Sequence, residues 1–212
     1  ISDPNCFATF YTSKLANENK IKVAHVGEGA DELFIGYQSW IKYYILSKYL
    51  GKFLNIKVIK SLKIIYKIFK KLFDKIEYDS WKFDYIKRHI EDKPIFWGTS
   101  NSITTNLKNK ILSTRMRKKF RGYDSWEAIK DIRKSFISKV NKKDFLKWMT
   151  YLELNTRLPD LLLMRVDKMS MAFSLESRVP FLDHKLIEYV MNIPSDKLIK
   201  NKNPKYLLKK VI

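Results

Sequence analysis

The sequence predicts an α/β protein that is mostly helical and contributes one short strand to a parallel sheet. Residues 21–26 form a β-branched apolar run of the length expected for a strand buried on both faces. A glycine loop follows this run, and a helical segment begins directly after the loop. Most of the remaining chain places apolar residues at helical spacing between prolines and helix caps. With 212 residues and 45% hydrophobic composition, the chain is long enough for one large domain with a core.

The first elements follow from local signals. Asp3-Pro4 marks a helix start, and apolar residues at helical spacing then continue to about residue 16. The strand Ile21–Val26 comes next. After the glycine loop we expect one helix from Asp31 through Tyr44 and on toward Leu50.

The middle of the chain carries a long amphipathic pattern. From Val58 to Ile76 apolar residues recur at alternating spacings of four and three, with lysines on the opposite side. We favour a surface helix packed on the domain over a helix lying on a membrane. Residues 77–122 predict a helix, a loop around 91–103 and a short helix.

That short helix carries the most arginine-rich patch of the chain. A solvated face is the favoured interpretation of such a cluster, and a binding surface is the alternative. The patch consists of Arg115, Arg117, Lys118, Lys119 and Arg121.

Later helices are marked by carboxylates and prolines. Asp124 and Glu127 resemble a capping box. The residue before a proline resists the α conformation, so Leu158-Pro159 should break the chain's helical course. Asp144 should start a helix in which Phe145, Trp148 and Leu152 face inward. Asp160 should cap a helix from Leu161 to Ala172, and Asp183 should cap a helix that runs to Met191. Asn203-Pro204 should open a last helix.

The charge balance is strongly basic, with 42 Lys and Arg against 22 Asp and Glu and a net charge of +20. Such an excess can indicate nucleic acid or an anionic membrane surface. Only 8 of these residues are Arg and 34 are Lys, whereas base and phosphate recognition favour Arg. We therefore favour solvated lysine faces and regard nucleic-acid binding as the weaker interpretation.

Cys6 is the only cysteine, so no disulfide can form within the chain and no cysteine-based metal site is expected. A reducing cytoplasmic location fits this usage. There is no apolar run of about 18 residues that would predict a membrane span. The chain opens on Ile1 and closes within an apolar-periodic segment, which leads us to expect a piece of a longer protein; a homodimer stays open.

The glycine loop contains the first candidate site. A strand that ends in a glycine turn before a helix is where α/β folds place anionic ligands. Glycines flank Glu28, so the backbone can approach a ligand, and this carboxylate could take a proton from an attacking amine. Asp31 and Glu32 either complement the helix dipole or bind Mg²⁺ beside phosphates, and the residues alone leave both interpretations open.

A second constellation lies between residues 161 and 184. Its alternating charges within an apolar segment predict buried, mutually paired ions. They form either a structural ion network or a wall of the active site. The candidate wall residues are Arg165, Asp167, Lys168, Glu176 and Arg178, with Asp183 and His184 beside them.

Two blocks resemble a known family. Residues 27–37 read GEGADELFIGY and are similar to the GEGADELFGGY motif of glutamine-hydrolysing asparagine synthetases. Residues 158–184 resemble the LPDDLL, DRMSMA and SLEARVPFLDH blocks of the same family, in the same order. Residues 40–145 do not align with it.

The resemblance implies part of an adenine-nucleotide-hydrolase-like fold, the PP-loop ATP-pyrophosphatase parallel sheet, with a large helical C-terminal portion and residues 1–212 as one partial domain. It implies ATP and Mg²⁺ as cofactors and aspartate and glutamine-derived ammonia as substrates. Glu28 matches the carboxylate that helps form and aminate a β-aspartyl-adenylate. Asp31 matches the acid near Mg²⁺ and pyrophosphate, and Val26 and Gly27 match the pair lying against the nucleotide.

Departures from the family pattern limit what we expect of this chain. Val26 replaces a common Ser, Ile35 a Gly and Lys168 an Arg. The SGGxDS pyrophosphate loop, the nucleophilic cysteine of the glutaminase domain and a later lysine segment do not occur in these residues. We expect the chain alone to make no asparagine. A related amidotransferase or cyclase acting on another carboxylate, and a basic module on nucleic acid or anionic membrane, are the alternatives.

Overall fold

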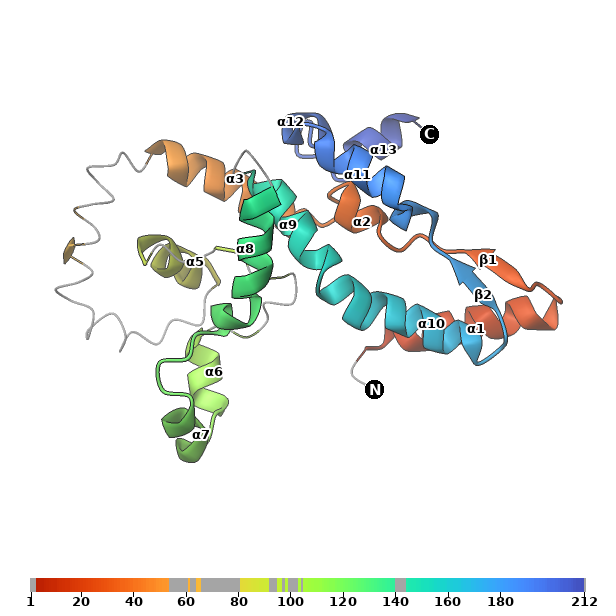
Figure 1. Ribbon diagram of the computed structural model, residues 1–212, viewed down its shortest axis with the longest axis horizontal. Helices are drawn as coiled ribbons and strands as arrows, with labels where there is room; N and C mark the ends of the chain where they lie inside the picture. Colours follow the sequence, from red (N-terminus) through yellow and green to blue (C-terminus); the bar gives the residue numbers. More distant parts are fainter. Residues whose placement is uncertain are drawn as a thin grey trace. The chain divides into compact units, whose positions relative to one another are not determined.

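The computed structural model describes residues 3–53, 61, 64–65, 81–91, 95–96, 98, 103, 105–139 and 144–211. Its contacts divide the chain into two compact units (Figure 1). The first unit combines Ile1–Lys42 with Asp144–Ile212, and the second comprises Tyr43–Lys143. In the described ranges no helix is both long enough and apolar enough to cross a bilayer.

The first unit contains a small parallel sheet. Strand β1 (Val23–His25) pairs in parallel with β2 (Glu176–Arg178), which confirms the predicted parallel strand. Helix α1 (Asn5–Glu18) begins after Asp3-Pro4 as expected and runs alongside α10 (Met164–Met171) (Figure 1).

Two expectations about the sheet are wrong. The strand is not buried on both faces, because Val23 is 38% exposed and the described sheet has only these two strands. The partner strand β2 was not predicted, since its polar residues Glu-Ser-Arg lack any β-branched or alternating pattern. This segment is a strand because it pairs with β1, not because of its local sequence.

The single helix expected from Asp31 to Leu50 is broken into α2 (Ala30–Leu33) and α3 (Gln38–Phe53). Ile35 causes the break, because its backbone is left-handed with φ 55°. This conformation is strained for a β-branched residue. The Ile35 side chain is fully buried, and its burial offsets the strain.

Most predicted caps of the first unit are present. Asp144 Oδ1 accepts hydrogen bonds from the backbone N–H groups of Leu146 and Lys147 and starts α9 (Phe145–Leu154). Asp183 does the same for α11 (His184–Asn192). Each such cap stabilises its helix by about 1 kcal/mol.

The predicted helix break is present but lies before Leu158, because α9 ends at Leu154 and residues 155–156 form a turn. The predicted cap at Asp160 is wrong. A π-helical turn, Leu158–Leu163, leads without interruption into α10, and the Asp160 N–H donates to the Thr156 carbonyl at 3.0 Å. Pro159 lies in the first turn of this segment, where its missing N–H removes no helical hydrogen bond.

The remaining elements of the first unit are short. A 3₁₀ turn, Pro180–Leu182, precedes α11, and α12 (Ser195–Leu198) follows it. Helix α13 (Tyr206–Val211) begins close to the predicted start at Asn203-Pro204. The core centres on α9, where Trp148 and Leu152 face inward as predicted and Phe145 is half-buried.

The second unit is helical in its described parts. Helix α5 (Trp81–Ile90), α6 (Thr105–Ile111) and the predicted short helix α7 (Thr114–Lys119) precede a 3₁₀ turn, Ser125–Ile129, that enters α8 (Lys130–Lys139). Asp124 caps this turn by accepting from the Trp126 N–H.

Tyr85, Phe96 and Phe136 are buried in the second unit, and Tyr43 stacks on Tyr85. The predicted amphipathic helix from Val58 to Ile76 lies outside the described residues, apart from residues 61, 64 and 65, which are helical. Most of the predicted loop around 91–103 also lies outside them.

Candidate functional site

The glycine loop joins β1 to α2, and its two glycines serve different needs. Gly29 has φ 90°, and a Cβ on it would lie 2.7 Å from Leu182 Cγ. Both conformation and space therefore require glycine at this position. A Cβ on Gly27 would meet nothing within 4 Å. The backbone of Gly27 is thus open to an approaching molecule, while Val26 is anchored by its N–H to the Arg178 carbonyl at 2.9 Å.

Glu28 is held by an arginine from α10. Arg165 Nη2 donates to Glu28 Oε1 at 2.8 Å, and Arg165 Nη1 donates to Asp3 Oδ2 at 2.8 Å. The Arg165 side chain is only 11% exposed. One guanidinium thus bridges two carboxylates and fixes the position of Glu28.

The charges in this bridge shift two pKa values. Burial alone would lower the pKa of Arg165, but its hydrogen bonds to Asp3 and Glu28 outweigh burial and raise the pKa. The hydrogen bond from Arg165, joined by the backbone N–H of Asn5, lowers the pKa of Asp3. Arg165 and Asp3 therefore each favour the charged form of the other.

Asp31 has a different kind of partner. Lys205 Nζ lies 2.9 Å from Asp31 Oδ1, and the two side chains are 31% and 40% exposed. Gly36 provides the space for this pair, because a Cβ there would lie 2.6 Å from Asp31 Cγ and 2.7 Å from Lys205 Cε. The pair is within reach of solvent and of a ligand.

Glu32 points into the unit and is 1% exposed. Tyr37 donates its hydroxyl to Glu32 Oε1 at 2.6 Å, and Arg157 Nη1 donates to the Tyr37 oxygen at 3.0 Å. Burial raises the pKa of Glu32 against the opposing hydrogen bond from Tyr37. Of the two acids at the head of α2, Glu32 is therefore structural, and only Asp31 is available to a ligand.

The three acids of residues 28–32 each find a cation from the second half of the chain. The pairs are Glu28 with Arg165, Asp31 with Lys205, and Glu32 with Arg157 through Tyr37. Three uncompensated carboxylates would repel an anionic ligand. Pairing removes this obstacle, so a nucleotide is compatible with the loop.

The five candidate wall residues behave differently from one another. Arg165 reaches Glu28, whereas Asp167 and Lys168 are exposed on α10. Glu176 and Arg178 pair with each other at 2.7 Å, and their side chains are more than half exposed. The predicted buried network within 161–184 is therefore wrong. Helix α10 buries one side against α1, and the partners of Arg165 come from outside the segment.

Sequence reasoning missed four residues of the site. Asp3 was assigned only to a helix start, and Lys205, Tyr37 and Arg157 were not singled out. Arg165 and Asp3 are 162 positions apart, so no local spacing could have paired them. Tyr37 and Arg157 do lie in the quoted motif blocks or directly beside them, which is the only signal that could have indicated them.

Asp31 fits a magnesium ion only together with phosphate oxygens. Among the described residues no group of three His, Cys, Asp or Glu side chains could hold a metal ion. Mg²⁺ is commonly bound by one or two carboxylates, with phosphates and water completing the shell. A half-exposed carboxylate such as Asp31 suits that arrangement.

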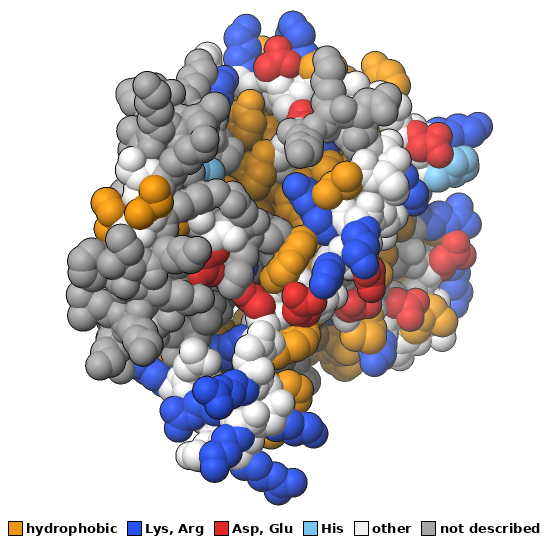
Figure 2. Space-filling view, turned by 60° about the vertical axis from the view of Figure 1, so that its left-hand side comes forward, with side chains coloured by type: hydrophobic (Ala, Val, Ile, Leu, Met, Phe, Trp, Pro, Cys, Tyr) orange, Lys and Arg blue, Asp and Glu red, His pale blue; other side chains and the backbone are white. Residues whose placement is uncertain are grey.

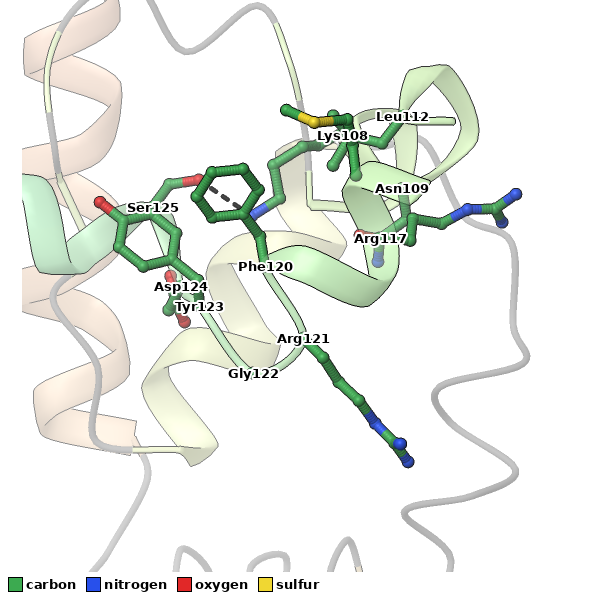
Figure 3. Close-up of a pocket in the computed structure, with 11 residues that line it drawn as sticks. Lys108, Asn109, Leu112, Arg117, Phe120, Arg121, Gly122, Tyr123, Asp124 and Ser125 are labelled. Carbon is green, nitrogen blue, oxygen red and sulfur yellow. Dashed lines mark hydrogen bonds between the residues drawn. The ribbon is translucent and has the colours of Figure 1, made fainter. Parts of the chain in front are cut away.

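The second unit has a cavity of about 720 Å³ between α6, α7 and the turn that follows. Lysine and arginine side chains gather on this part of the surface (Figure 2). Lys108 Nζ donates to Ser125 Oγ at 3.1 Å beside the rings of Phe120 and Tyr123, whereas Arg121 points away from the cavity (Figure 3).

Comparison with known proteins points to one family. The family model described as asparagine synthase matches residues 1–212. The asparagine synthetase (glutamine-hydrolyzing) 1 of Bacillus subtilis (strain 168) is 26% identical over 210 residues, which are 99% of this chain and 30% of that protein.

Two further relatives carry similar names. The asparagine synthetase (glutamine-hydrolyzing) 3 of the same strain is 51% identical over 51 residues, covering 24% of this chain and 8% of that protein. A putative asparagine synthetase (glutamine-hydrolyzing) of Mycobacterium bovis is 25% identical over 214 residues, covering 100% of this chain and 30% of that protein. The chain thus spans about 30% of the relatives that it matches along its whole length. No solved structure gives a significant match.

Proposed function

Because the chain belongs to the asparagine synthase family, we propose that it forms part of an ATP-dependent ligase that amidates aspartate. In this reaction the β-carboxylate attacks the α-phosphorus of ATP, and pyrophosphate leaves. Ammonia then attacks the acyl carbon of the β-aspartyl-adenylate, AMP leaves, and the nitrogen loses a proton. The ammonia comes from glutamine, hydrolysed by a domain outside these residues.

The observation that supports this proposal best is the Arg165 bridge to Glu28. It fixes a carboxylate beside the open backbone of Gly27, at the end of a parallel strand, where α/β folds bind ligands. Val26 and Gly27 would lie along the nucleotide. Their contacts would come from the backbone, since Val26 offers no side-chain hydrogen bond.

Glu28 is proposed to receive the proton that the attacking nitrogen loses. A nitrogen that has just joined an acyl carbon is positively charged and strongly acidic, so a weak base is sufficient. A carboxylate held close to the reacting nitrogen can serve as that base. The Glu28 side chain is 22% exposed, so it stays accessible while Arg165 holds it in place.

Asp31 is proposed to supply a carboxylate to the magnesium ion. When bound, that ion would neutralise charge on the departing pyrophosphate. Asp31 is well suited to this role because it is half-exposed and next to the loop. Arg165 is a positioning residue in this scheme, whereas no contact supports a role for Asp167, Lys168, Glu176 or Arg178.

Aspartate-dependent exchange between ATP and labelled pyrophosphate tests the function. We expect no exchange by the 212 residues alone. We expect exchange by a polypeptide that also includes the flanking coding region, if that region supplies an SGGxDS loop. In that polypeptide Glu28→Gln should lose asparagine formation, because Glu28 is proposed to act in the amination step. Robust exchange by the 212 residues alone would contradict the expected inactivity. Exchange that ignores aspartate but responds to another carboxylate would favour a related amidotransferase or cyclase.

A second candidate function has one observation in its favour. Phe120 and Tyr123 line a cavity flanked by the basic patch of α7, and aromatic rings beside cations suit single-stranded nucleic acid. Retention on single-stranded DNA that falls steeply with salt would support this alternative. Weak retention at all salt concentrations would exclude it, and acidic liposomes serve as the comparison surface.

A further inference from the structure

We propose that Lys205 is a phosphate-binding residue of the candidate site, placed beside Asp31 to hold the leaving pyrophosphate. This inference rests on the proposed function, since it assigns a further residue to the same site. It adds a cation from the C-terminal part of the chain to a loop whose other proposed ligand-binding groups are carboxylates and backbone.

The Lys205 side chain is accessible to a ligand. Its Nζ lies 2.9 Å from Asp31 Oδ1, and the side chain is 31% exposed. An ammonium group has three N–H donors, and Asp31 uses one of them. Lys205 can therefore keep its bond to Asp31 and still donate to phosphate oxygens.

The other cations of the loop lack this freedom. Arg165 is committed to Glu28 and Asp3 with an 11% exposed side chain. Arg157 donates to the Tyr37 hydroxyl and lies 3.8 Å from Glu153. Among the three cations that compensate the loop acids, Lys205 is the one best able to meet a ligand.

Contacts with the loop fix the backbone conformation of Lys205. Its N–H lies 3.1 Å from the Phe34 carbonyl and 3.4 Å from the Ile35 carbonyl, at the break between α2 and α3. Lys205 itself has φ 53°, and Asn201 and Lys202 have φ 54° and 59°.

A left-handed backbone is unusual for residues other than glycine. Three such residues within residues 201–205 persist only where surrounding contacts determine the conformation. An ordinary surface lysine needs no such arrangement, so the segment is built to deliver Lys205 to the loop.

Gly36 leaves the space that Asp31 and Lys205 occupy. Any side chain at this position would displace the Asp31 carboxylate and the Lys205 Cε atom. The chain thus places Asp31, Gly36 and Lys205 together from two distant segments. The result is a carboxylate for a divalent cation and an ammonium for a phosphate, side by side.

The test is a titration of the 212-residue chain with inorganic pyrophosphate and Mg²⁺, followed by the ¹³Cε signals of its lysines in NMR spectra. We expect the Lys205 signal to shift on addition of pyrophosphate. We expect Lys205→Met to weaken pyrophosphate affinity by about tenfold, because a charge-assisted hydrogen bond is lost. Lys205→Arg should restore most of the affinity, since it keeps the cation.

Lys209→Met is the matched control, because Lys209 is an exposed lysine on α13, the helix that begins directly after Lys205. It should bind pyrophosphate as the wild type does. A Lys205 signal that does not respond to pyrophosphate overturns the proposal, and so does a Lys205→Met variant of unchanged affinity. The first of these readouts needs no variant, so a variant that fails to fold leaves the proposal testable.

The two proposals fail in distinguishable ways. Pyrophosphate binding requires neither aspartate nor Glu28. If binding depends on Lys205 but no polypeptide containing this chain shows aspartate-dependent exchange, the proposed acceptor is wrong and the phosphate site stands. If exchange is found but Lys205→Met binds pyrophosphate normally, the function stands and this inference falls.

Discussion

Glu28 and Asp31 lie three positions apart in one loop, yet their charges are compensated in opposite ways. Glu28 faces a nearly buried guanidinium that is fixed by a second carboxylate. Asp31 faces the ammonium of Lys205, whose side chain is partly exposed. A guanidinium forms planar, directional bonds, whereas an ammonium is a compact charge that can be shared. The first pair suits a group that must stay in place, and the second suits a group that exchanges partners.

The largest expected effect comes from breaking the rigid pair. In Arg165→Met the carboxylate of Glu28 loses its partner while it stays mostly buried, and we expect the free energy of unfolding to fall by about 3 kcal/mol. Urea denaturation measures this change. Arg165→Lys is the control, because it keeps a charge but reaches one carboxylate only, and its loss should be smaller. A loss below about 1 kcal/mol in Arg165→Met would show that the bridge is not structural.

Alanine substitutions at the loop glycines should cost less stability than Arg165→Met. They should also distinguish the surroundings of Glu28 from those of Asp31. Gly29→Ala forces a left-handed Ala against Leu182, and we expect a loss of about 2 kcal/mol. Gly36→Ala meets side chains that can move, so about 1 kcal/mol is expected, together with weaker pyrophosphate binding. Gly27→Ala should leave stability unchanged. Thermal unfolding compares the three variants. Equal losses of stability would contradict a difference between rigid packing around Gly29 and adjustable packing around Gly36.

Removing the exchangeable cation should hardly affect stability. Exposed ion pairs contribute little, so Lys205→Met should change the free energy of unfolding by about 0.5 kcal/mol or less. Urea denaturation beside Arg165→Met makes the comparison direct. A loss as large as that of Arg165→Met would mean that Lys205 is a structural residue and would weaken the case for a ligand role.

The pH dependence of stability gives the smallest signal. The pKa of Asp3 is lowered, so the stability it contributes is present above its unfolded value of 3.8 and is lost as pH falls through the lower folded value. The pKa of Glu32 is raised, so its contribution is present below 4.5 and is lost as pH rises through the folded value.

Urea denaturation between pH 3 and pH 6 measures both contributions. In Arg165→Met the free energy of unfolding should fall less steeply below pH 3.8. In Glu32→Gln it should fall less steeply above pH 4.5. A profile that is the same in all three proteins would contradict both assignments.

Local signals predicted much of this unit. The caps at Asp144 and Asp183, the helix after Asp3-Pro4 and the strand before the glycine loop all depend on neighbours in sequence. The same holds for Glu28 and Asp31 as candidates, because glycines and a strand mark the loop. Their partners could not be predicted, since Arg165 lies 137 positions from Glu28 and only folding brings the two together.

Errors arose where tertiary contacts override local preference. β2 is polar and becomes a strand only through β1, and Ile35 breaks a helix where its sequence favours continuation. The helix break was predicted a few residues too late, because Pro159 starts the next helical segment and does not end the preceding one. Each error lies next to the loop or to the segments that supply its cations.

The division of the loop's charges between distant segments has a consequence for the order of synthesis. Residues 28–32 leave the ribosome long before Arg157, Arg165 and Lys205 do. Until residue 205 has emerged, the nascent loop carries carboxylates whose counter-charges do not yet exist. Contacts of such long sequence separation form slowly and late. The loop therefore cannot complete its ion pairs before residue 205 has emerged, and a ligand that needs all of these pairs can bind only after that point.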